Sequence, residues 1–173
     1  AHSKIVGLRA GRLMPDGQNY PLNPLAAFSS INSSAFAMAP LYLVKLAEVN
    51  FLRAEGALRG WNMGGTAEQF YNEGIKNAYL DEPMMGAMEY NAALQEYMAL
   101  ETPVDYIQKE VSGDGEDWES VTKIGVKWND GDDQETKLEK IITQKYIALF
   151  PLSTEAWTEM RRTGYPKVFP VLN

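Results

Sequence analysis

The feature that most constrains the fold is a pair of helical patterns joined by a glycine-rich turn between residues 40 and 80. Pro40 suits the first turn of a helix, because its missing N–H has no helical partner to lose there. Apolar residues then recur at spacings of three and four residues, on one helix face: Val44, Ala47, Phe51, Ala54 and Leu58. Gly60 is expected to end this helix, since glycine readily takes the left-handed conformation that closes one.

A second helix is predicted to follow. Thr66 and Gln69 have the spacing of a capping box, in which each side chain bonds the backbone N–H of the other residue. The apolar side of this helix comprises Ala67, Phe70, Tyr71, Ala78 and Tyr79. Two such helices form an antiparallel helical hairpin, the unit of helical-repeat proteins, and Trp61 is expected to pack in its turn.

The rest of the chain alternates helical patterns with long irregular segments. Residues 1–39 form a loop-rich lead-in with many glycines, prolines, serines and asparagines, and residues 113–133 form a polar, glycine-rich insertion. A helix is expected over residues 89–100, and residues 134–166 contain two more. These patterns predict a mostly α protein with long irregular loops.

The two helices within 134–166 have recognisable ends. Asp132 is the expected cap of the first, and Pro151 ends it. Its buried stripe is Leu138, Ile141, Ile142, Tyr146 and Leu149. Ser153 is expected to cap the last helix, and Gly164 to end it.

The adjacent arginines Arg161 and Arg162 suggest either an anion clamp or part of the scaffold. They fall in the last turn of the predicted helix, where cations suit the helix dipole. Ala156, Trp157 and Met160 have the spacing of its inward face. Glu159 lies three residues before Arg162, and the more distant Glu55 is a further candidate partner for either arginine. The scaffold interpretation is therefore favoured.

The composition excludes several kinds of chemistry. The chain has no cysteine and one histidine, His2, so thiolate or histidine catalysis and metal sites built from these residues have no credible members. A net charge of −7 without a basic run disfavours nucleic-acid binding. Glu48 and Glu55 share a helix face, but their backbones lie roughly 10 Å apart, which disfavours a glycosidase pair. We expect no enzyme activity, no cofactor and no metal site.

The candidate ligand-binding residues are Trp118, Trp128, Asn129 and Asp130 in the polar insertion. Aromatic faces stack on sugar rings, and amides and carboxylates bond sugar hydroxyls. Each tryptophan has an alternative role, which is to pin the insertion to the core. Calcium binding by the acidic residues 129–133 is a further alternative, although their spacing does not match an EF-hand loop.

The stretch QKYIALFPLSTEAWTEMRRTGYPKVFPV resembles the C-terminal signature of the SusD/RagB-type outer-membrane nutrient-binding lipoproteins. Upstream, AEVNFLRAEGALRGW and AEQFYNEGIKNAY resemble the helical hairpin of that family. The signature residues that match are Glu55, Trp157, Arg161, Arg162, Gly164, Tyr165 and Pro166. The resemblance implies tetratricopeptide-like helical hairpins, with residues 1–173 forming the C-terminal portion of a single SusD-like domain.

The resemblance also implies a function. Such proteins bind oligosaccharides, or sometimes peptides, without catalysis. They sit on the external face of the outer membrane and deliver nutrient to a TonB-dependent, SusC-like transporter. Membrane contact is expected only through a lipid anchor that is absent from this chain. The alternative is a helical-repeat protein-interaction module, or a peptide-binding member, with no sugar ligand.

Overall fold

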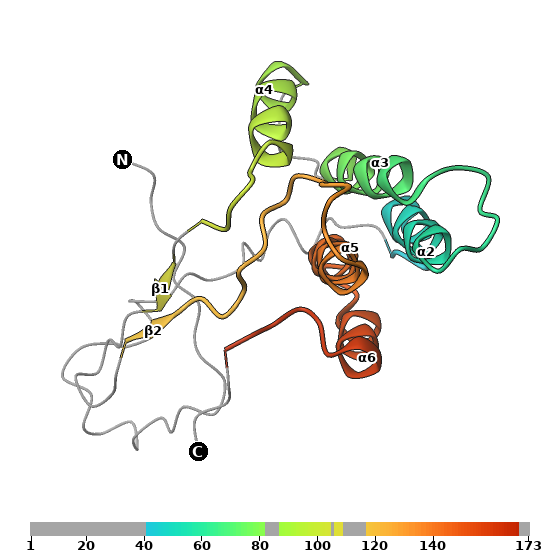
Figure 1. Ribbon diagram of the computed structural model, residues 1–173. Coiled ribbons are helices and arrows are strands. Elements are labelled where there is room, and N and C mark those ends of the chain that lie inside the picture. The colour runs from blue at the N-terminus through green and yellow to red at the C-terminus, as the bar shows by residue number, and fades with distance from the viewer. Residues whose placement is uncertain (1–40, 82–86, 105, 109–116, 170–173) are drawn as a thin grey trace. The chain divides into compact units, whose positions relative to one another are not determined.

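The computed structural model describes residues 41–81, 87–104, 106–108 and 117–169, so predictions for the lead-in 1–39 and for Pro40 lie outside the described residues (Figure 1). The chain divides into two compact units. A strand unit comprises residues 1–41, 105–121 and 168–173, and a helical unit comprises residues 42–104 and 122–167. In the strand unit, β1 (Ile107–Gln108) pairs with β2 (Trp118–Glu119) in an antiparallel arrangement.

The helical unit confirms the mostly α prediction. Its helices are α2 (Leu46–Leu58), α3 (Ala67–Leu80), α4 (Ala87–Met98), α5 (Gln134–Ala148) and α6 (Ser153–Thr163). Figure 1 shows α2 beside α3, with α5 packed below them and α6 against α5. The core between them contains Ala47, Phe51, Ala54, Phe70, Tyr71, Ile75, Leu94, Trp128, Ile141 and Ile142. None of the helices in the described ranges is both long and apolar enough to cross a membrane.

The predicted helical hairpin is present, with a later start. Helix α2 begins at Leu46, so Val44 precedes it and is exposed, whereas Ala47, Phe51 and Ala54 are fully buried. The apolar pattern therefore begins before the first residue of the helix. Gly60 has a φ of 82° and follows the end of α2, as predicted.

Thr66 caps α3 as predicted. Its hydroxyl accepts from the Gln69 N–H at 3.1 Å, and Gln69 Oε1 accepts from the Thr66 N–H at 2.9 Å. We expect Thr66→Ala to lower the free energy of unfolding by about 1 kcal/mol, because it removes the hydroxyl that accepts from the Gln69 N–H, while the backbone N–H of residue 66 can still donate to Gln69. Urea denaturation measures this. Ser153→Ala is the matched control and should change stability by less than about 0.5 kcal/mol, and equal losses in both variants would contradict the assignment.

The caps of α5 and α6 differ from the predicted ones. Asp133, not Asp132, caps α5 by accepting from the Thr136 N–H at 2.7 Å, and Asp132 instead pairs with the buried Lys140 at 2.5 Å. Ser153 is the first residue of α6 and makes no cap, since the preceding Leu152 takes that position. Gly164 closes α6 with a φ of 77°, as predicted.

Trp157 is not an inward-facing core residue, so that prediction is wrong. Its side chain is 57% exposed, and the Arg161 guanidinium lies over its ring at 4.8 Å. Helix α6 packs on α5 and reaches α2 through the Arg162–Glu55 ion pair, and Ala156 is its buried residue. The helical period correctly indicated a shared face, but within the described part of the chain nothing buries the large ring on that face.

Candidate functional site

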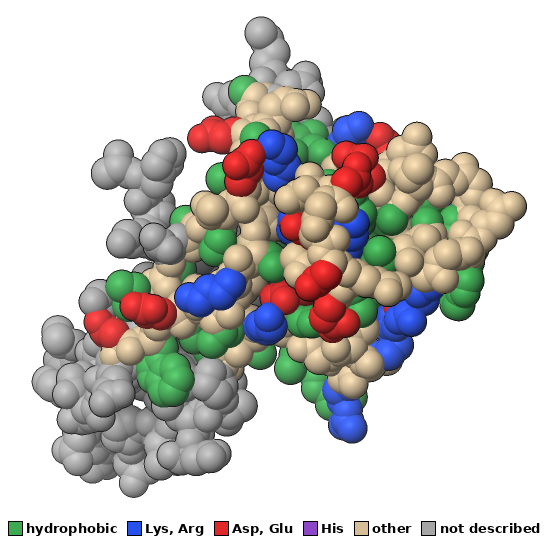
Figure 2. All heavy atoms as spheres, in the orientation of Figure 1, with side chains coloured by type: hydrophobic (Ala, Val, Ile, Leu, Met, Phe, Trp, Pro, Cys, Tyr) green, Lys and Arg blue, Asp and Glu red, His purple; other side chains and the backbone are tan. Residues whose placement is uncertain are grey.

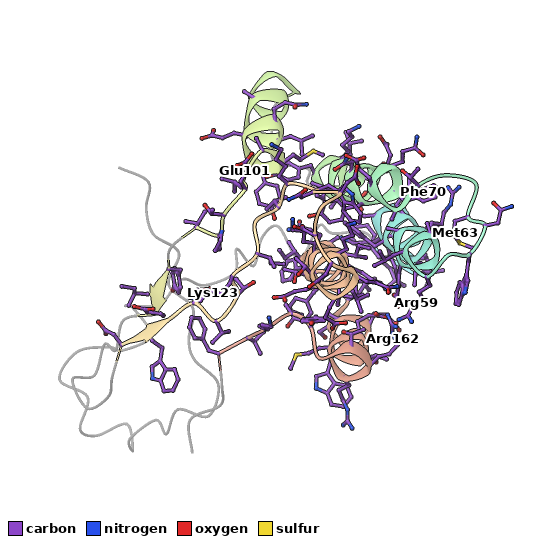
Figure 3. All side chains as sticks on the ribbon, viewed as in Figure 1. Arg59, Met63, Phe70, Glu101, Lys123 and Arg162 are labelled. Atoms are coloured by element: carbon purple, nitrogen blue, oxygen red, sulfur yellow. The ribbon has the colours of Figure 1, made fainter. Side chains whose placement is uncertain are left out.

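The Arg162 side chain lies at the centre of an ion-pair cluster that joins α2, α5 and α6. Its Nη1 and Nη2 donate to the two carboxylate oxygens of Glu55 at 2.7 and 2.6 Å, and Nη2 also donates to Glu159 at 2.6 Å. Arg59 binds Glu55 at 2.7 Å, and the buried Lys145 binds Glu159 at 3.0 Å. Figure 3 shows Arg59 and Arg162 converging from two elements.

The contacts of this cluster favour the scaffold interpretation over an anion clamp. Burial raises the pKa of Glu55, but hydrogen bonds from Arg162 and Arg59 outweigh it and hold that pKa below its ordinary value. Since both guanidinium groups already bind carboxylates of the protein itself, a ligand anion would have to compete with those carboxylates. Arg161 lies outside the cluster, on Trp157.

The other signature residues fix the chain after α6. Tyr165 is buried, and its hydroxyl donates to Glu135 Oε1 at 2.7 Å. That bond, with burial, raises the pKa of Tyr165 to about 12. Pro166 is buried beside it, and Lys167 binds the buried Glu139 at 2.7 Å. These contacts hold the segment after Gly164 against α5.

The four predicted ligand-binding residues fall in different places. Trp118 is half-buried in β2 of the strand unit, whereas Trp128, Asn129 and Asp130 belong to the helical unit. Trp128 is only 9% exposed, its ring packs on Tyr71 at 5.2 Å, and its Nε1 donates to Asp130 at 3.0 Å. For Trp128 these contacts favour the alternative role of pinning the loop to the core. Asn129 and Asp130 are exposed beside it.

Several oxygen atoms of the acidic loop accept internal bonds from the described residues, although Asp130 Oδ2 is not among them. Asn129 Oδ1 accepts from the Gly131 N–H at 2.9 Å, while Asp130 and Asp132 bind Trp128 and Lys140. Asp133 caps α5. Within the described ranges, no group of three or more acidic, histidine or cysteine residues is arranged to hold a metal ion.

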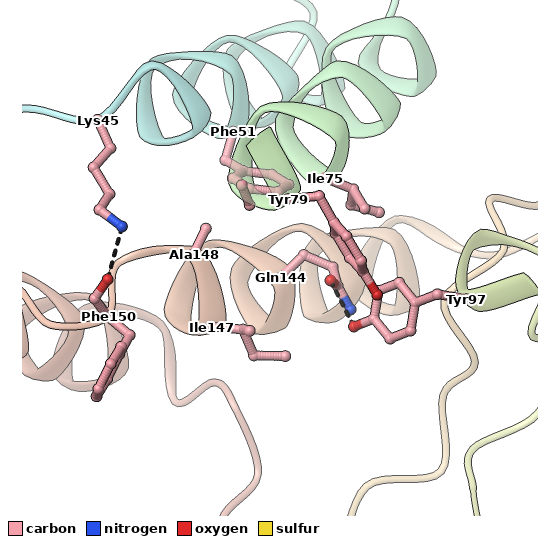
Figure 4. A pocket seen from close by; sticks show the side chains of 10 residues that line it. Lys45, Phe51, Ile75, Tyr79, Tyr97, Gln144, Ile147, Ala148 and Phe150 are labelled. Atoms are coloured by element: carbon pink, nitrogen blue, oxygen red, sulfur yellow. Dashed lines mark hydrogen bonds between the residues drawn. The ribbon is translucent and has the colours of Figure 1, made fainter. Parts of the chain in front are cut away.

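A pocket that sequence reasoning missed opens between the helices, with a volume of about 480 Å³ (Figure 4). Its walls are Lys45, Phe51, Ile75, Ala78, Tyr79, Tyr97, Gln144, Ile147, Ala148 and Phe150. Tyr97 donates its hydroxyl to Gln144 Oε1 at 2.9 Å, and Lys45 Nζ donates to the Phe150 carbonyl at 2.7 Å. Burial raises the pKa of the Tyr97 hydroxyl.

The pocket is chemically suited to apolar groups. Its walls are mostly aliphatic and aromatic, and internal hydrogen bonds already engage the Tyr97 hydroxyl, the Gln144 amide oxygen and the Lys45 ammonium group. A group that buried several hydroxyls there would lose its bonds to water without replacing them. The pocket exists only where α2, α3, α4 and α5 come together, and no local sequence pattern signals it.

Charge gives no sign of a nucleic-acid interface. The chain carries a net charge of −7, and acidic and basic side chains are interspersed over the face shown in Figure 2. Phosphate recognition needs a clustered positive surface, which that face does not have.

The fold and the ion-pair cluster define an all-α protein built on a helical hairpin, whose C-terminal helix is locked to the hairpin by buried charges. The family model "Susd and RagB outer membrane lipoprotein" matches residues 1–173, and the chain belongs to this SusD-like family. The family is one of outer membrane lipoproteins. No curated protein sequence matches the chain.

Solved structures agree with this family assignment. A chitin-binding SusD homologue from Flavobacterium johnsoniae is 45% identical with a TM-score of 0.63, over 76% of this chain and 26% of that one. A SusD homologue from Bacteroides thetaiotaomicron is also 45% identical, with a TM-score of 0.59, over 73% and 25%. A homologue from Bacteroides uniformis is 42% identical, with a TM-score of 0.63, over 73% and 25%. This chain thus spans about a quarter of the length of these relatives.

Proposed function

We propose that this chain is part of a non-catalytic, cell-surface glycan-binding protein that delivers oligosaccharide to a TonB-dependent, SusC-like transporter in the outer membrane. The observation that carries the proposal is membership of the SusD-like family together with 45% identity to a chitin-binding homologue. The protein acts on the external face of the outer membrane, held there by a lipid anchor.

The candidate ligand contacts in the proposal are Trp118 in the strand unit and, as a separate set, the exposed pair Asn129 and Asp130 in the helical unit. An aromatic contact contributes about 0.5–1.5 kcal/mol beyond burial, by analogy with aromatic pairs. A millimolar ligand needs only about 4.1 kcal/mol, which a few such contacts and hydrogen bonds supply. Trp128 acts indirectly in this account, by holding the loop that presents Asn129 and Asp130.

The ion-pair cluster supports a binding role over hydrolysis. Glu55 was one of the two carboxylates considered for a glycosidase pair. Both of its oxygens accept hydrogen bonds from arginines, and its pKa is lowered. A general acid needs a raised pKa and an open path to the substrate, and Glu55 has neither.

A second candidate function is favoured by the apolar pocket. Its Tyr79–Tyr97 wall and aliphatic lining fit the apolar side chains of a peptide. In that case the chain is a peptide-binding member of the family, or a helical-repeat interaction module, and has no sugar ligand.

Affinity electrophoresis distinguishes these functions. The chain migrates through native gels that contain chitin oligosaccharides, starch, xylan or mannan, with Trp118→Ala beside it. We expect retardation by at least one glycan and a weaker effect for Trp118→Ala. Retardation by none of them, combined with binding of apolar peptides, would replace the glycan proposal with the peptide one.

A further inference from the structure

We infer that Trp61 forms a sugar-stacking platform at the hairpin loop, where the exposed amide of Asn62 and the neighbouring Asn129–Asp130 loop bind hydroxyls of the same oligosaccharide. This inference rests on the proposed glycan-binding function and adds a site within the helical unit. We define the hairpin loop as residues 59–66, between α2 and α3.

Trp61 is exposed rather than packed in the turn as the sequence suggested. Its side chain is 63% exposed, and one edge lies over Gly56 of α2, where an added Cβ would come within 3.4 Å of the indole. Among the described residues, no cation or other ring covers the indole. Trp157, which is 57% exposed, differs because Arg161 lies on its ring, and Trp128 is buried.

Backbone and side-chain bonds hold the hairpin loop in one conformation. The Trp61 N–H donates to the Gly56 carbonyl at 2.9 Å, and Gly60 takes a left-handed φ of 82°. Arg53 donates to the Met63 carbonyl at 2.8 Å, while its guanidinium lies over the Phe70 ring at 3.9 Å. Figure 3 labels Met63, within the loop, and Phe70, in the first turn of α3. A platform that is already ordered loses little conformational entropy when a ligand binds.

The far side of the same loop is also fixed. The Thr66–Gln69 capping box orders its end, and Asn62 Oδ1 accepts from the Gly64 N–H at 3.2 Å. That bond orients the exposed Asn62 amide, and within the described part of the chain no acceptor takes its Nδ2 hydrogens. An oriented amide donor beside an aromatic ring is the combination that a hydroxylated ring requires.

The acidic loop adjoins the same end of the helical unit. Gln134 Nε2 donates to the Leu58 carbonyl at 3.3 Å, so the start of α5 lies beside the end of α2. Trp61 follows Leu58 by three residues, and Asp130 precedes Gln134 by four. Chain geometry limits Trp61 to roughly 10 Å and Asp130 to roughly 14 Å from this contact, so the two residues are at most about 30 Å apart. An extended oligosaccharide of several rings is needed to reach both.

The chemistry of these groups selects a neutral hexopyranose chain. The indole offers a flat apolar face for the C–H side of a sugar ring, and Asn62, Asn129 and Asp130 offer amide and carboxylate groups for hydroxyls. Asp130 disfavours an acidic sugar at its end of the site, because the two carboxylates would repel.

Isothermal titration calorimetry of the full chain tests the inference with chitin oligosaccharide and with each glycan of the electrophoresis panel. We expect Trp61→Ala to weaken binding about tenfold, Trp61→Phe to restore most of the affinity, and Trp157→Ala to leave it unchanged. Trp157 is the matched control, because its exposure is similar and its ring is covered by Arg161.

The outcomes separate this inference from the proposed function. If the chain binds a glycan and Trp61→Ala binds it equally well, the platform is wrong and the glycan-binding function stands. An equal loss in Trp61→Ala and Trp157→Ala would also overturn the platform, since it would mark a general effect of removing exposed indoles. If the chain binds none of the glycans, both the platform and the proposed function fail. Far-UV circular dichroism confirms that each variant retains its helices.

Discussion

Gly125→Ala is expected to lower the free energy of unfolding by about 3 kcal/mol. Gly125 is buried where the segment before α5 crosses the end of α4, and an added Cβ would overlap the backbone of Leu100 and Glu101. Backbone atoms cannot rotate away as a side chain can, so the whole segment would have to move.

Existing bonds oppose that movement. The N–H groups of Val126 and Lys127 both donate to the Leu100 carbonyl at 2.8 Å, and the buried Tyr71 hydroxyl donates to the Val126 carbonyl at 2.6 Å. Displacing the segment would break bonds that each contribute about 1 kcal/mol. Urea denaturation of the full chain measures the loss.

Gly131→Ala is the matched control for Gly125→Ala. An added Cβ there would come within 3.2 Å of the Asn129 side chain alone, which can adjust at an exposed site. We expect a change below about 1 kcal/mol for this control. A stability loss at Gly125 no larger than at Gly131 would show that the segment does not cross α4 this closely.

Arg162→Ala is expected to cost about 2–3 kcal/mol, whereas Arg161→Ala changes stability by less than about 0.5 kcal/mol. Arg162 binds the carboxylates of Glu55 and Glu159, which are only 8% and 13% exposed, so its removal leaves buried charges with fewer partners. Arg162 itself is 40% exposed, which keeps the cost below that of a fully buried pair. Arg161 rests on an exposed ring.

Acid titration provides a second readout for Arg162. The pKa of Glu55 is lowered in the folded state, so the stability that its ion pairs add is present above the unfolded value of 4.5 and is lost as the pH falls through the folded value. The stability gap between wild type and Arg162→Ala should therefore be full at pH 7 and close below pH 4.5. A gap that is independent of pH, or similar losses for both arginines, would contradict the ion-pair account.

Local patterns predicted the elements well, because their causes are local. The spacing of Ala47, Phe51 and Ala54 marks a buried helix face, and the Thr66–Gln69 pair marks a helix start. Both depend on residues within two turns of each other. Gly60 and Gly164 end their helices for the same kind of reason, since each takes a left-handed φ.

The predictions were wrong in two situations. In one, two neighbouring residues were equally good candidates for the same role, and in the other, burial depended on residues far away in the sequence. Asp132 and Asp133 are both good caps, and only the backbone geometry assigns the role to Asp133. The period of α6 placed Trp157 on an apolar face but contained no information on what covers that face. Trp61 was expected to pack in the hairpin turn, but the structure leaves its indole exposed.

The site features depend on contacts over long distances in the sequence. Glu55 and Arg162 are 107 residues apart, and the sequence suggested their pairing only as one option between two arginines. The pocket combines α2, α3, α4 and α5, and Gln134 at the start of α5 contacts Leu58 at the end of α2 across 76 residues. A periodic pattern of apolar residues does not indicate which distant segments of the chain come into contact.

The central claim is that this chain binds an oligosaccharide and does not cleave it. The most direct measurement is a calorimetric titration of the chain with chitin oligosaccharide. The sugar is then recovered from the sample cell of the calorimeter and its length is measured by chromatography. The account predicts a saturable binding curve with a Kd of about 1 mM or tighter, and sugar of unchanged length. Binding accompanied by shorter products, or the absence of any saturable heat with this sugar and with the other glycans, would contradict it.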